Sequence, residues 1–178
     1  AWAEAGNAPA ADTVLALANS TKYGGAGYPG SDLATLAGNN GSSIEIALHE
    51  FGHSLGNLAD EYTYGGPATY AGGEPSSANL TTYTSSELDQ LDAKWHLWLS
   101  DGNVSTYEGG GYSVFGIYRP TNNSLMRNLG RPFEQVNSEQ IIIEIYKIVD
   151  PVDAATPAPG IVDLDQVFTV DPIDPVAH

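Results

Sequence analysis

The spacing of apolar residues changes along the chain, and it predicts strands first and helices afterwards. Residues 13–19 form a short apolar run that predicts a buried strand, and the Gly-rich residues 22–30 behind it predict a turn. Apolar and polar residues alternate over residues 32–37, which predicts a second, short strand at a sheet edge. Such a strand either pairs with an extended peptide or simply completes the sheet.

The next apolar residues recur every three or four positions, which predicts a helix. Ser42 and Glu45 have the spacing of a capping box, so this helix is expected to begin at about Ser42. Gly56 is expected to end it in the left-handed conformation, after which the chain can turn back. The side of the helix that faces the core is expected to carry Ile44, Ala47 or Leu48, Phe51 and Leu55.

The middle of the chain alternates between irregular and periodic segments. Residues 62–83 are rich in Gly, Tyr, Ser, Thr and Pro, which predicts an irregular loop. Residues 84–99 predict a helix with its N-cap at Thr84 or Ser85. Residues 137–149 predict a capped helix that should be well buried, because apolar positions nearly encircle it.

The distribution of Pro and Ala predicts how the chain divides. Residues 1–150 are expected to form one domain, and its first strand comes so early that elements upstream of residue 1 are expected to be missing. The Pro/Ala-rich residues 151–160 predict a linker. Residues 161–178 predict either an extended tail or the start of a further module.

A metal-binding motif lies within the first predicted helix. His49, Glu50 and His53 form the pattern H-E-x-x-H. Residues four apart lie one turn above each other on the same face of a helix, so both imidazoles can reach one tetrahedral Zn²⁺. Glu50 lies about 100° further round the helix, beside the metal, where a general base can take a proton from water.

The third ligand is expected after the predicted end of this helix. A turn at Gly56 can carry the chain back toward the metal, and acidic side chains follow at Asp60 and Glu61. The chain contains no cysteine, so a zinc site has to use histidine and carboxylate ligands. Spacing alone leaves both carboxylates open as the third ligand.

The net charge of the chain excludes some partners. It carries 22 acidic and 6 basic residues, for a net charge of −16. Six cations cannot form the basic surface that nucleic-acid binding needs, and no apolar run is long enough to cross a bilayer. The excess of acidic residues indicates a soluble protein. Alternatively, it indicates a preference for basic substrates or binding of Ca²⁺, although the sequence contains no EF-hand loop that would support calcium binding.

Two stretches together resemble a known family. The segment HEFGHSLGNLADEY over residues 49–62, followed by SLMRN over residues 124–128, resembles the IgA-peptidase-like zinc metallopeptidases, or igalysins, of the metzincin clan. The common metzincin motif has its third ligand where this chain has Ala59. The igalysin form has one extra residue before an aspartate, which points to Asp60 as the ligand.

The resemblance implies a fold and a set of site residues. It implies His49, His53 and Asp60 as zinc ligands, Glu50 as general base, and Met126 as the methionine of a turn beneath the metal. The implied fold is an α+β metzincin-like domain with a small, mixed, twisted sheet and an active-site helix. Its lower part would be mostly irregular and would end in a helix, and the predicted strand at 32–37 would form the upper rim of the cleft.

The implied function is zinc-dependent endopeptidase activity on a protein or peptide substrate. A secreted or cell-surface location, outside the cell or in the periplasm, accords with the resemblance and with the absence of cysteine. The alternative is a non-catalytic zinc-binding interaction module on a peptidase-like scaffold. A non-peptidic hydrolase that uses the same metal is a third hypothesis, with no sequence feature of its own. The sequence indicates neither the oligomeric state nor the cleavage specificity.

Overall fold

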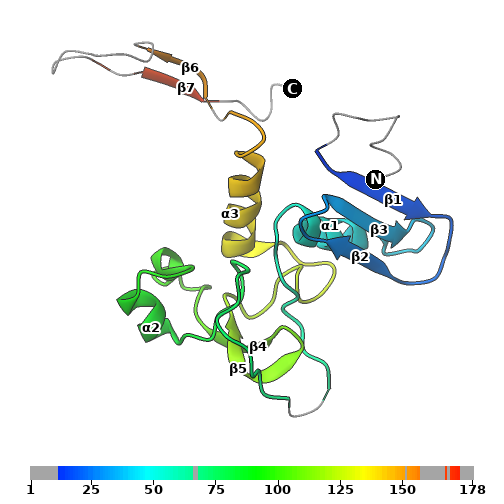
Figure 1. Ribbon diagram of the computed structural model, residues 1–178, viewed down its shortest axis with the longest axis horizontal. Coiled ribbons are helices and arrows are strands. Elements are labelled where there is room, and N and C mark those ends of the chain that lie inside the picture. Colours follow the sequence, from blue (N-terminus) through cyan, green and yellow to red (C-terminus); the bar gives the residue numbers. More distant parts are fainter. Residues whose placement is uncertain (1–11, 66–67, 151, 157–166, 168, 173–178) are drawn as a thin grey trace.

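A computed structural model of the chain describes residues 12–65, 68–150, 152–156, 167 and 169–172. The described residues form a small mixed α+β structure (Figure 1). Its elements are β1 (Val14–Ala18), β2 (Gly25–Tyr28), β3 (Leu33–Ala37), α1 (Ser43–Ser54), α2 (Ser85–Gln90), the 3₁₀ helix η1 (His96–Trp98), β4 (Tyr107–Gly110), β5 (Ser113–Arg119), α3 (Glu134–Ile145), β6 (Val152–Thr156) and β7 (Thr169–Pro172).

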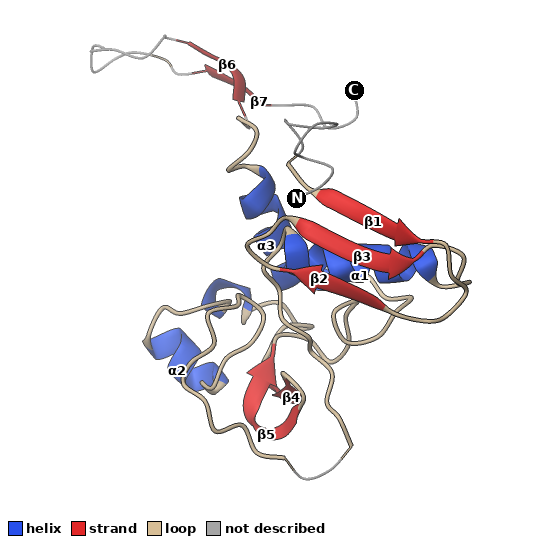
Figure 2. Ribbon diagram, turned by 45° about the vertical axis from the view of Figure 1, so that its right-hand side comes forward, coloured by secondary structure: helices blue, strands red, loops and turns tan. Residues whose placement is uncertain are grey.

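Strands β1, β2 and β3 form a small sheet, and helix α1 lies behind it. β1 pairs with β3 in parallel and β2 pairs with β3 antiparallel, in the order β1-β3-β2. Helix α1 packs against β2 and β3 (Figure 2). The strand predicted at 32–37 exists, but its predicted edge position is wrong, because β3 is the central strand.

The edge strand beside α1 is β2, which lies inside the segment predicted to be a turn. Its sequence Gly-Ala-Gly-Tyr has no apolar alternation, so the strand pattern is absent. The glycines are needed because the strand lies very close to the helix. A Cβ at Gly27 would lie 2.5 Å from the Glu50 carbonyl oxygen, and one at Gly25 would lie 2.6 Å from Glu50 Oε1.

The first predicted strand forms, but it is not buried. Leu15 and Leu17 on β1 are 45% and 65% exposed. The physical reason is the position of β1 at the other edge of the sheet, whereas α1 covers β2 and β3. An apolar run alone does not distinguish a central strand from an edge strand.

Helix α1 begins where the sequence predicts, but its ends differ in detail. Ser42 is the N-cap residue without a side-chain cap bond, and the Glu45 carboxylate accepts a hydrogen bond from Gly130 N at 3.1 Å instead. The left-handed residue after the helix is Asn57, with φ of 50°, and not Gly56. Gly56 is required by space, because a Cβ there would lie 2.7 Å from the Gly52 carbonyl oxygen.

The predicted core-facing stripe of α1 is wrong in part. Ile44 is 75% and Leu48 is 44% exposed, although Leu55 is buried. The buried residues of the helix are Ile46, His49, Glu50, Gly52 and Ser54. The helix therefore turns the face with the H-E-x-x-H residues inward. The interactions of these polar residues, and not the apolar stripe, determine which face is buried.

The helix predicted over residues 84–99 is two short helices. Thr84 is the N-cap of α2, as one of the two predicted residues, and it forms a capping box with Glu87. Asp92 and Lys94 then adopt positive φ of 46° and 51°, which ends the helix. Lys94 Nζ donates to the carbonyl oxygens of Pro75 and Ser77 at 2.5 and 2.7 Å. The break also lets the next apolar residues join the core of this part, which consists of Leu88, Trp95, Val104 and Val136.

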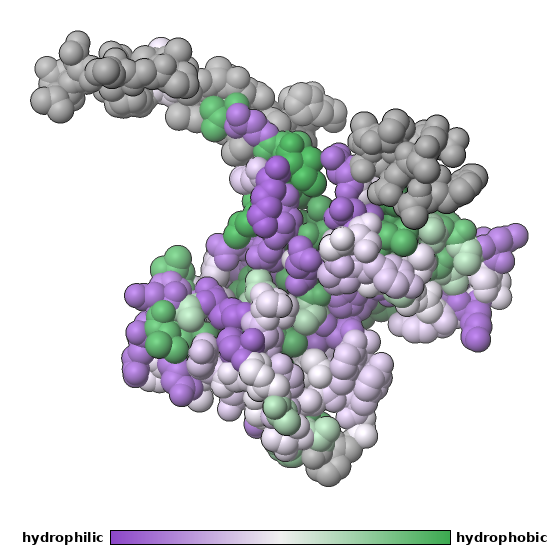
Figure 3. Space-filling view, viewed as in Figure 1, coloured by the Kyte–Doolittle hydropathy of each residue, from purple (hydrophilic) through white to green (hydrophobic). Residues whose placement is uncertain are grey.

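The last predicted helix is α3, which begins earlier and lies nearer the surface than expected. It starts at Glu134 without a side-chain cap bond, and Asn137 is a buried residue within it, not a cap. Ile142 and Ile143 are 47% and 46% exposed, so the prediction of a well-buried helix is wrong. The space-filling view shows polar purple and apolar green side chains next to one another along α3 (Figure 3). Val136 and Asn137 are the buried residues of α3, so most of its encircling apolar pattern is not covered by the described residues.

Beyond α3, the segment predicted to be a linker contains a strand. β6 pairs antiparallel with β7, and this hairpin extends away from α3 (Figure 1). Residues 152–156 of that segment form this strand, and its remaining residues lie outside the described ones. The division into residues 1–150 and 151–178 stays a prediction. No described helix has both the length and the apolar character needed to cross a membrane.

Candidate metal centre

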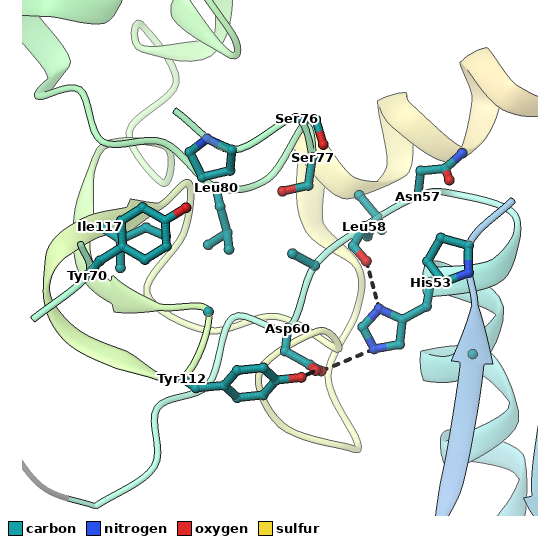
Figure 4. Close-up of a pocket in the computed structure, with 15 residues that line it drawn as sticks. His53, Asn57, Leu58, Asp60, Tyr70, Ser76, Ser77, Leu80, Tyr112 and Ile117 are labelled. Atoms are coloured by element: carbon teal, nitrogen blue, oxygen red, sulfur yellow. Dashed lines mark hydrogen bonds and ion pairs between the residues drawn. The ribbon is translucent and has the colours of Figure 1, made fainter. Parts of the chain in front are cut away.

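Three side chains predicted from the sequence converge on one point. His49 and His53 lie one turn apart on α1, and Asp60 comes from the extended segment behind the helix. Asp60 Oδ1 lies 3.0 Å from His49 Nε2 and 3.1 Å from His53 Nε2, and the two Nε2 atoms are 3.2 Å apart. Figure 4 shows His53 and Asp60 pointing at each other across the site.

Backbone carbonyl groups fix the orientation of both imidazoles. His49 Nδ1 donates to the carbonyl oxygen of Leu125 at 3.0 Å, and His53 Nδ1 donates to that of Leu58 at 2.6 Å. A neutral imidazole with its proton on Nδ1 presents a lone pair at Nε2. Both Nε2 atoms therefore point their lone pairs at each other and at the carboxylate. This second layer of hydrogen bonds is typical of histidines that bind a metal.

The geometry of these atoms fits a shared cation. Three lone-pair acceptors within 3.2 Å of one another repel unless a positive charge lies between them. Zinc bound at about 2.0–2.2 Å in a tetrahedron separates its ligand atoms by roughly 3.3–3.5 Å. The observed separations are close to this value. The donor set of two imidazoles and one carboxylate is one that zinc accepts, and it leaves a fourth position open.

The turn between β4 and β5 holds Asp60 in place. The Tyr112 hydroxyl donates to Asp60 Oδ2, and Gly111 N donates to the Asp60 carbonyl oxygen at 2.8 Å. Burial raises the pKa of Asp60, but its close contacts with His49 and His53 and the hydrogen bond from Tyr112 outweigh burial and hold that pKa well below its usual range. Burial and the same carboxylate raise the pKa of Tyr112 to about 12, so its hydroxyl stays protonated and donates.

Glu61, the alternative ligand, points away from the site into the interior. It is fully buried, and its carboxylate accepts hydrogen bonds from Asn79 Nδ2 (3.0 Å), Asn137 Nδ2 (2.9 Å) and Ser124 Oγ (2.7 Å). Burial raises the pKa of Glu61, although these donors act in the opposite direction. The structure thus places Asp60, and not Glu61, beside the two histidines.

Asn79 links this interior network to the ligand segment. Its amide oxygen accepts from Ala59 N and its amide nitrogen donates to the Ala59 carbonyl oxygen, both at 2.9 Å. These two bonds hold the backbone directly before Asp60. A residue in the loop predicted to be irregular therefore positions the ligand segment.

Met126 packs against the turn of α1 that contains Gly52, between His49 and His53. Its side chain is fully buried, and a Cβ at Gly52 would lie 2.6 Å from its Sδ atom. The Met126 carbonyl oxygen accepts from Glu61 N at 2.9 Å. The turn that contains Met126 also supplies the Leu125 carbonyl oxygen, which holds His49. The turn that contains Met126 is thus packed against the helix that carries both imidazoles.

Glu50 lies between the site and the edge strand. It is largely buried, and the Gly27 N–H on β2 is a hydrogen-bond partner of its carboxylate. Burial raises the pKa of Glu50, although the charges of His49 and His53 and the Gly27 N–H act in the opposite direction. A carboxylate with a raised pKa beside a metal can accept a proton and release it again.

Two hollows lie on either side of the converging side chains. The larger, of about 870 Å³, lies on the side of His53 and Asp60 (Figure 4). The smaller, of about 570 Å³, lies on the side of His49 and Glu50. β2 borders both hollows, with Gly25 on the smaller and Gly27 on the larger. An extended chain that crosses the centre therefore has space on each side.

Comparison with known families places the chain among peptidases. The family model described as IgA peptidase M64 matches residues 1–104, which is more than half of the chain and includes both histidines, Glu50 and Asp60. The chain belongs to the IgA peptidase M64 family. This confirms the family resemblance seen in the sequence. The family is one of metallopeptidases, which accords with the clustered His49, His53 and Asp60. A search among curated proteins found no match.

Sequence reasoning missed the residues of this M64 chain that support the ligands. These residues are far from Asp60 in the sequence and belong to no periodic pattern. They are Asn79, Tyr112, Ser124 and Asn137, at 19, 52, 64 and 77 positions from Asp60. Only the run Gly109-Gly110-Gly111 before Tyr112 signals a special turn. Nothing in a single sequence shows which distant segment that turn contacts.

Proposed function

We propose that this chain is a zinc-dependent endopeptidase with a metzincin-like catalytic centre. The observation that carries the proposal is the convergence of His49 Nε2, His53 Nε2 and Asp60 Oδ1, with Glu50 beside them, in a member of a peptidase family. His49, His53 and Asp60 would hold the metal. The bound cation would supply Lewis acidity, which polarises the scissile carbonyl group and lowers the pKa of water.

The remaining chemistry belongs to Glu50. Its carboxylate takes the proton of the attacking water and passes it to the nitrogen atom of the amine that leaves. Burial raises its pKa, which makes the carboxylate a stronger base for the first transfer than an exposed glutamate would be. The hydrogen bond from the Gly27 N–H holds the carboxylate in place for both transfers.

The edge strand β2 is the part of the structure that suits an extended substrate. Its free side borders both hollows, so a peptide that pairs with β2 crosses the metal centre. This role replaces the one expected for the strand at 32–37. Met126 would be the methionine of the metzincin turn, which its burial against Gly52 supports.

The test is metal content together with cleavage. We expect about one zinc per chain by elemental analysis, and cleavage of an unfolded protein that a chelator abolishes and zinc restores. Glu50→Gln should keep the zinc and lose at least about a hundred-fold in kcat/KM, the size of effect typical of a general base. His53→Ala should lose both zinc and activity.

A matched control is His96→Ala. His96 lies on η1 outside the metal group, with Asp92 3.6 Å away, so its removal should leave both readouts unchanged. Full activity in Glu50→Gln would refute the assigned base. Bound zinc without cleavage of any peptide in a random library would favour the non-catalytic binding module instead.

A further inference from the structure

Three of the six basic residues of this acidic chain lie within one short segment. These are Arg119, Arg127 and Arg131. Arg119 is buried and donates from Nη1 to the carbonyl oxygens of Glu108 and Gly109 at 2.7 Å each. Arg127 is only partly buried and lines the smaller hollow, which Glu50 also lines.

The two inner arginines share a single neutral acceptor. Arg127 Nη1 donates to the Asn122 carbonyl oxygen at 2.6 Å, and Arg119 Nη2 donates to the same oxygen at 3.1 Å. Within the described part of the chain, no carboxylate lies at ion-pair distance from either guanidinium group. Burial, followed by the charge of Arg127, lowers the pKa of Arg119 to about 10. Positive charge is therefore concentrated here, and the charge of Glu61 acts on Arg119 without a direct ion pair.

Most donors of Arg127 are free to bind something else. A guanidinium group has five N–H donors, and Asn122 uses one of those on Arg127. The Glu45 carboxylate of α1 accepts a hydrogen bond from Gly130 N, three residues after Arg127, at 3.1 Å. A guanidinium group at the wall of a hollow binds a carboxylate with two parallel hydrogen bonds, and this is the strongest contact that it can make.

Two arguments place this hollow on the side of the departing amine. Glu50 lines the smaller hollow and must reach the leaving nitrogen, so the residue that carries this nitrogen lies there. β2 runs from Gly25, on the smaller hollow, to Gly27, on the larger. A peptide antiparallel to β2 runs the other way, so its C-terminal part also enters the smaller hollow.

We propose that Arg127 binds a substrate carboxylate in this hollow, which gives a preference for such a group just after the cleaved bond. The proposal rests on the peptidase function proposed above. The carboxylate is either the side chain of Asp or Glu or the free C-terminus of a short substrate. The net negative charge of the chain would favour basic substrates, whereas the positive charge of Arg127 in this hollow favours an acidic group at this one position.

The test compares internally quenched peptides that differ at one position. Peptides with Glu or Gln directly after the cleaved bond, each with an amidated C-terminus, report side-chain recognition. A third peptide carries Gln there and a free C-terminus two residues later, and reports terminal recognition. One carboxylate peptide should be cleaved at least about ten-fold faster in kcat/KM than the amidated Gln peptide, since a hydrogen-bonded charge pair contributes an effect of this order.

Variants of Arg127 separate this contact from general charge effects. Arg127→Gln should abolish the preference, and Arg127→Glu should reverse it toward Lys at the same position. Arg131→Gln removes the same charge from an exposed residue that lines neither hollow, so it should keep the preference. Equal preference in Arg127→Gln and the unaltered protein would overturn the proposal.

Peptide affinity, measured in an inactive variant, tests the carboxylate preference without relying on cleavage rates. In the inactive Glu50→Gln background, fluorescence anisotropy should show the carboxylate peptide binding at least about five-fold more tightly than the amidated Gln peptide. Adding Arg127→Gln should remove this difference. Zinc-dependent cleavage without any carboxylate preference would refute this inference alone, whereas the absence of all cleavage would refute the peptidase function.

Discussion

Glu61 is a buried carboxylate whose removal should strongly destabilise the folded protein. Its carboxylate receives hydrogen bonds from Asn79, Ser124 and Asn137. In Glu61→Ala these three donors lose their acceptor in a buried space. Each unsatisfied donor costs about 1–3 kcal/mol, so allowing for relaxation the free energy of unfolding should fall by about 4 kcal/mol. This is a large part of the roughly 5–15 kcal/mol that holds an ordinary domain together.

Glu61→Gln should be much milder, because it keeps one acceptor oxygen. That oxygen can still accept from Asn79 and Asn137, both of which contact Oε1. The new amide nitrogen faces Ser124 Oγ, which can rotate to accept, although it already accepts from Met126 N at 3.2 Å. We therefore expect a loss of about 1 kcal/mol.

The same pair of proteins gives a pH dependence with a definite sign. The pKa of Glu61 is raised in the folded chain, so the folded state favours the protonated form. Stability from this group is fully present below the ordinary pKa of 4.5 and is lost as pH rises through the raised pKa. The unaltered protein should therefore lose stability relative to Glu61→Gln as pH rises over this window.

Urea denaturation of the metal-free proteins measures these differences without a contribution from metal binding. Asp89→Ala, which removes an exposed carboxylate of α2, is the control and should change the free energy of unfolding by less than about 0.5 kcal/mol. A Glu61→Ala protein as stable as the control would refute the buried network. Equal, large losses in the Ala and Gln variants would show that the charge, and not acceptor capacity, stabilises it.

Two further predictions concern the surroundings of the metal. Tyr112→Phe removes the donor to Asp60 and should weaken zinc binding about ten- to a hundred-fold, measured by competition with a chromophoric chelator; an unchanged affinity would contradict the positioning role. Gly52→Ala places a Cβ 2.6 Å from Met126 Sδ and should lower the free energy of unfolding by about 1–3 kcal/mol in urea denaturation, whereas a stabilised variant would show that Met126 does not pack there.

The sequence predicted the parts of the site that follow from local geometry. His49 and His53 are four residues apart on a helix, so their convergence depends on helical pitch alone. Local geometry could not show whether Asp60 or Glu61 is the third ligand, because both residues follow the same turn. The structure separates them, with Asp60 beside the histidines and Glu61 among interior amides.

What the sequence could not predict depends on contacts between distant segments. β2 is a strand only because Gly25 and Gly27 fit against α1, and no pattern within the strand itself shows this. The interruption of the helix after α2 depends on Lys94, which reaches carbonyl groups in the preceding loop. Propensity favours one continuous helix there, and tertiary contacts override it.

Asp60 and Glu61 show how the site and the fold depend on each other. Neighbouring side chains of an extended segment point to opposite sides, so one carboxylate can face the cleft while the next enters the interior. Glu61 is bound by residues from the loop before α2, the turn of Met126 and α3, and these bonds fix the direction in which Asp60 points. A metal held by Asp60 therefore stabilises the same segment that Glu61 anchors. Since zinc binds only the arranged ligands, metal binding and the interior network should reinforce each other, and loss of either should weaken both.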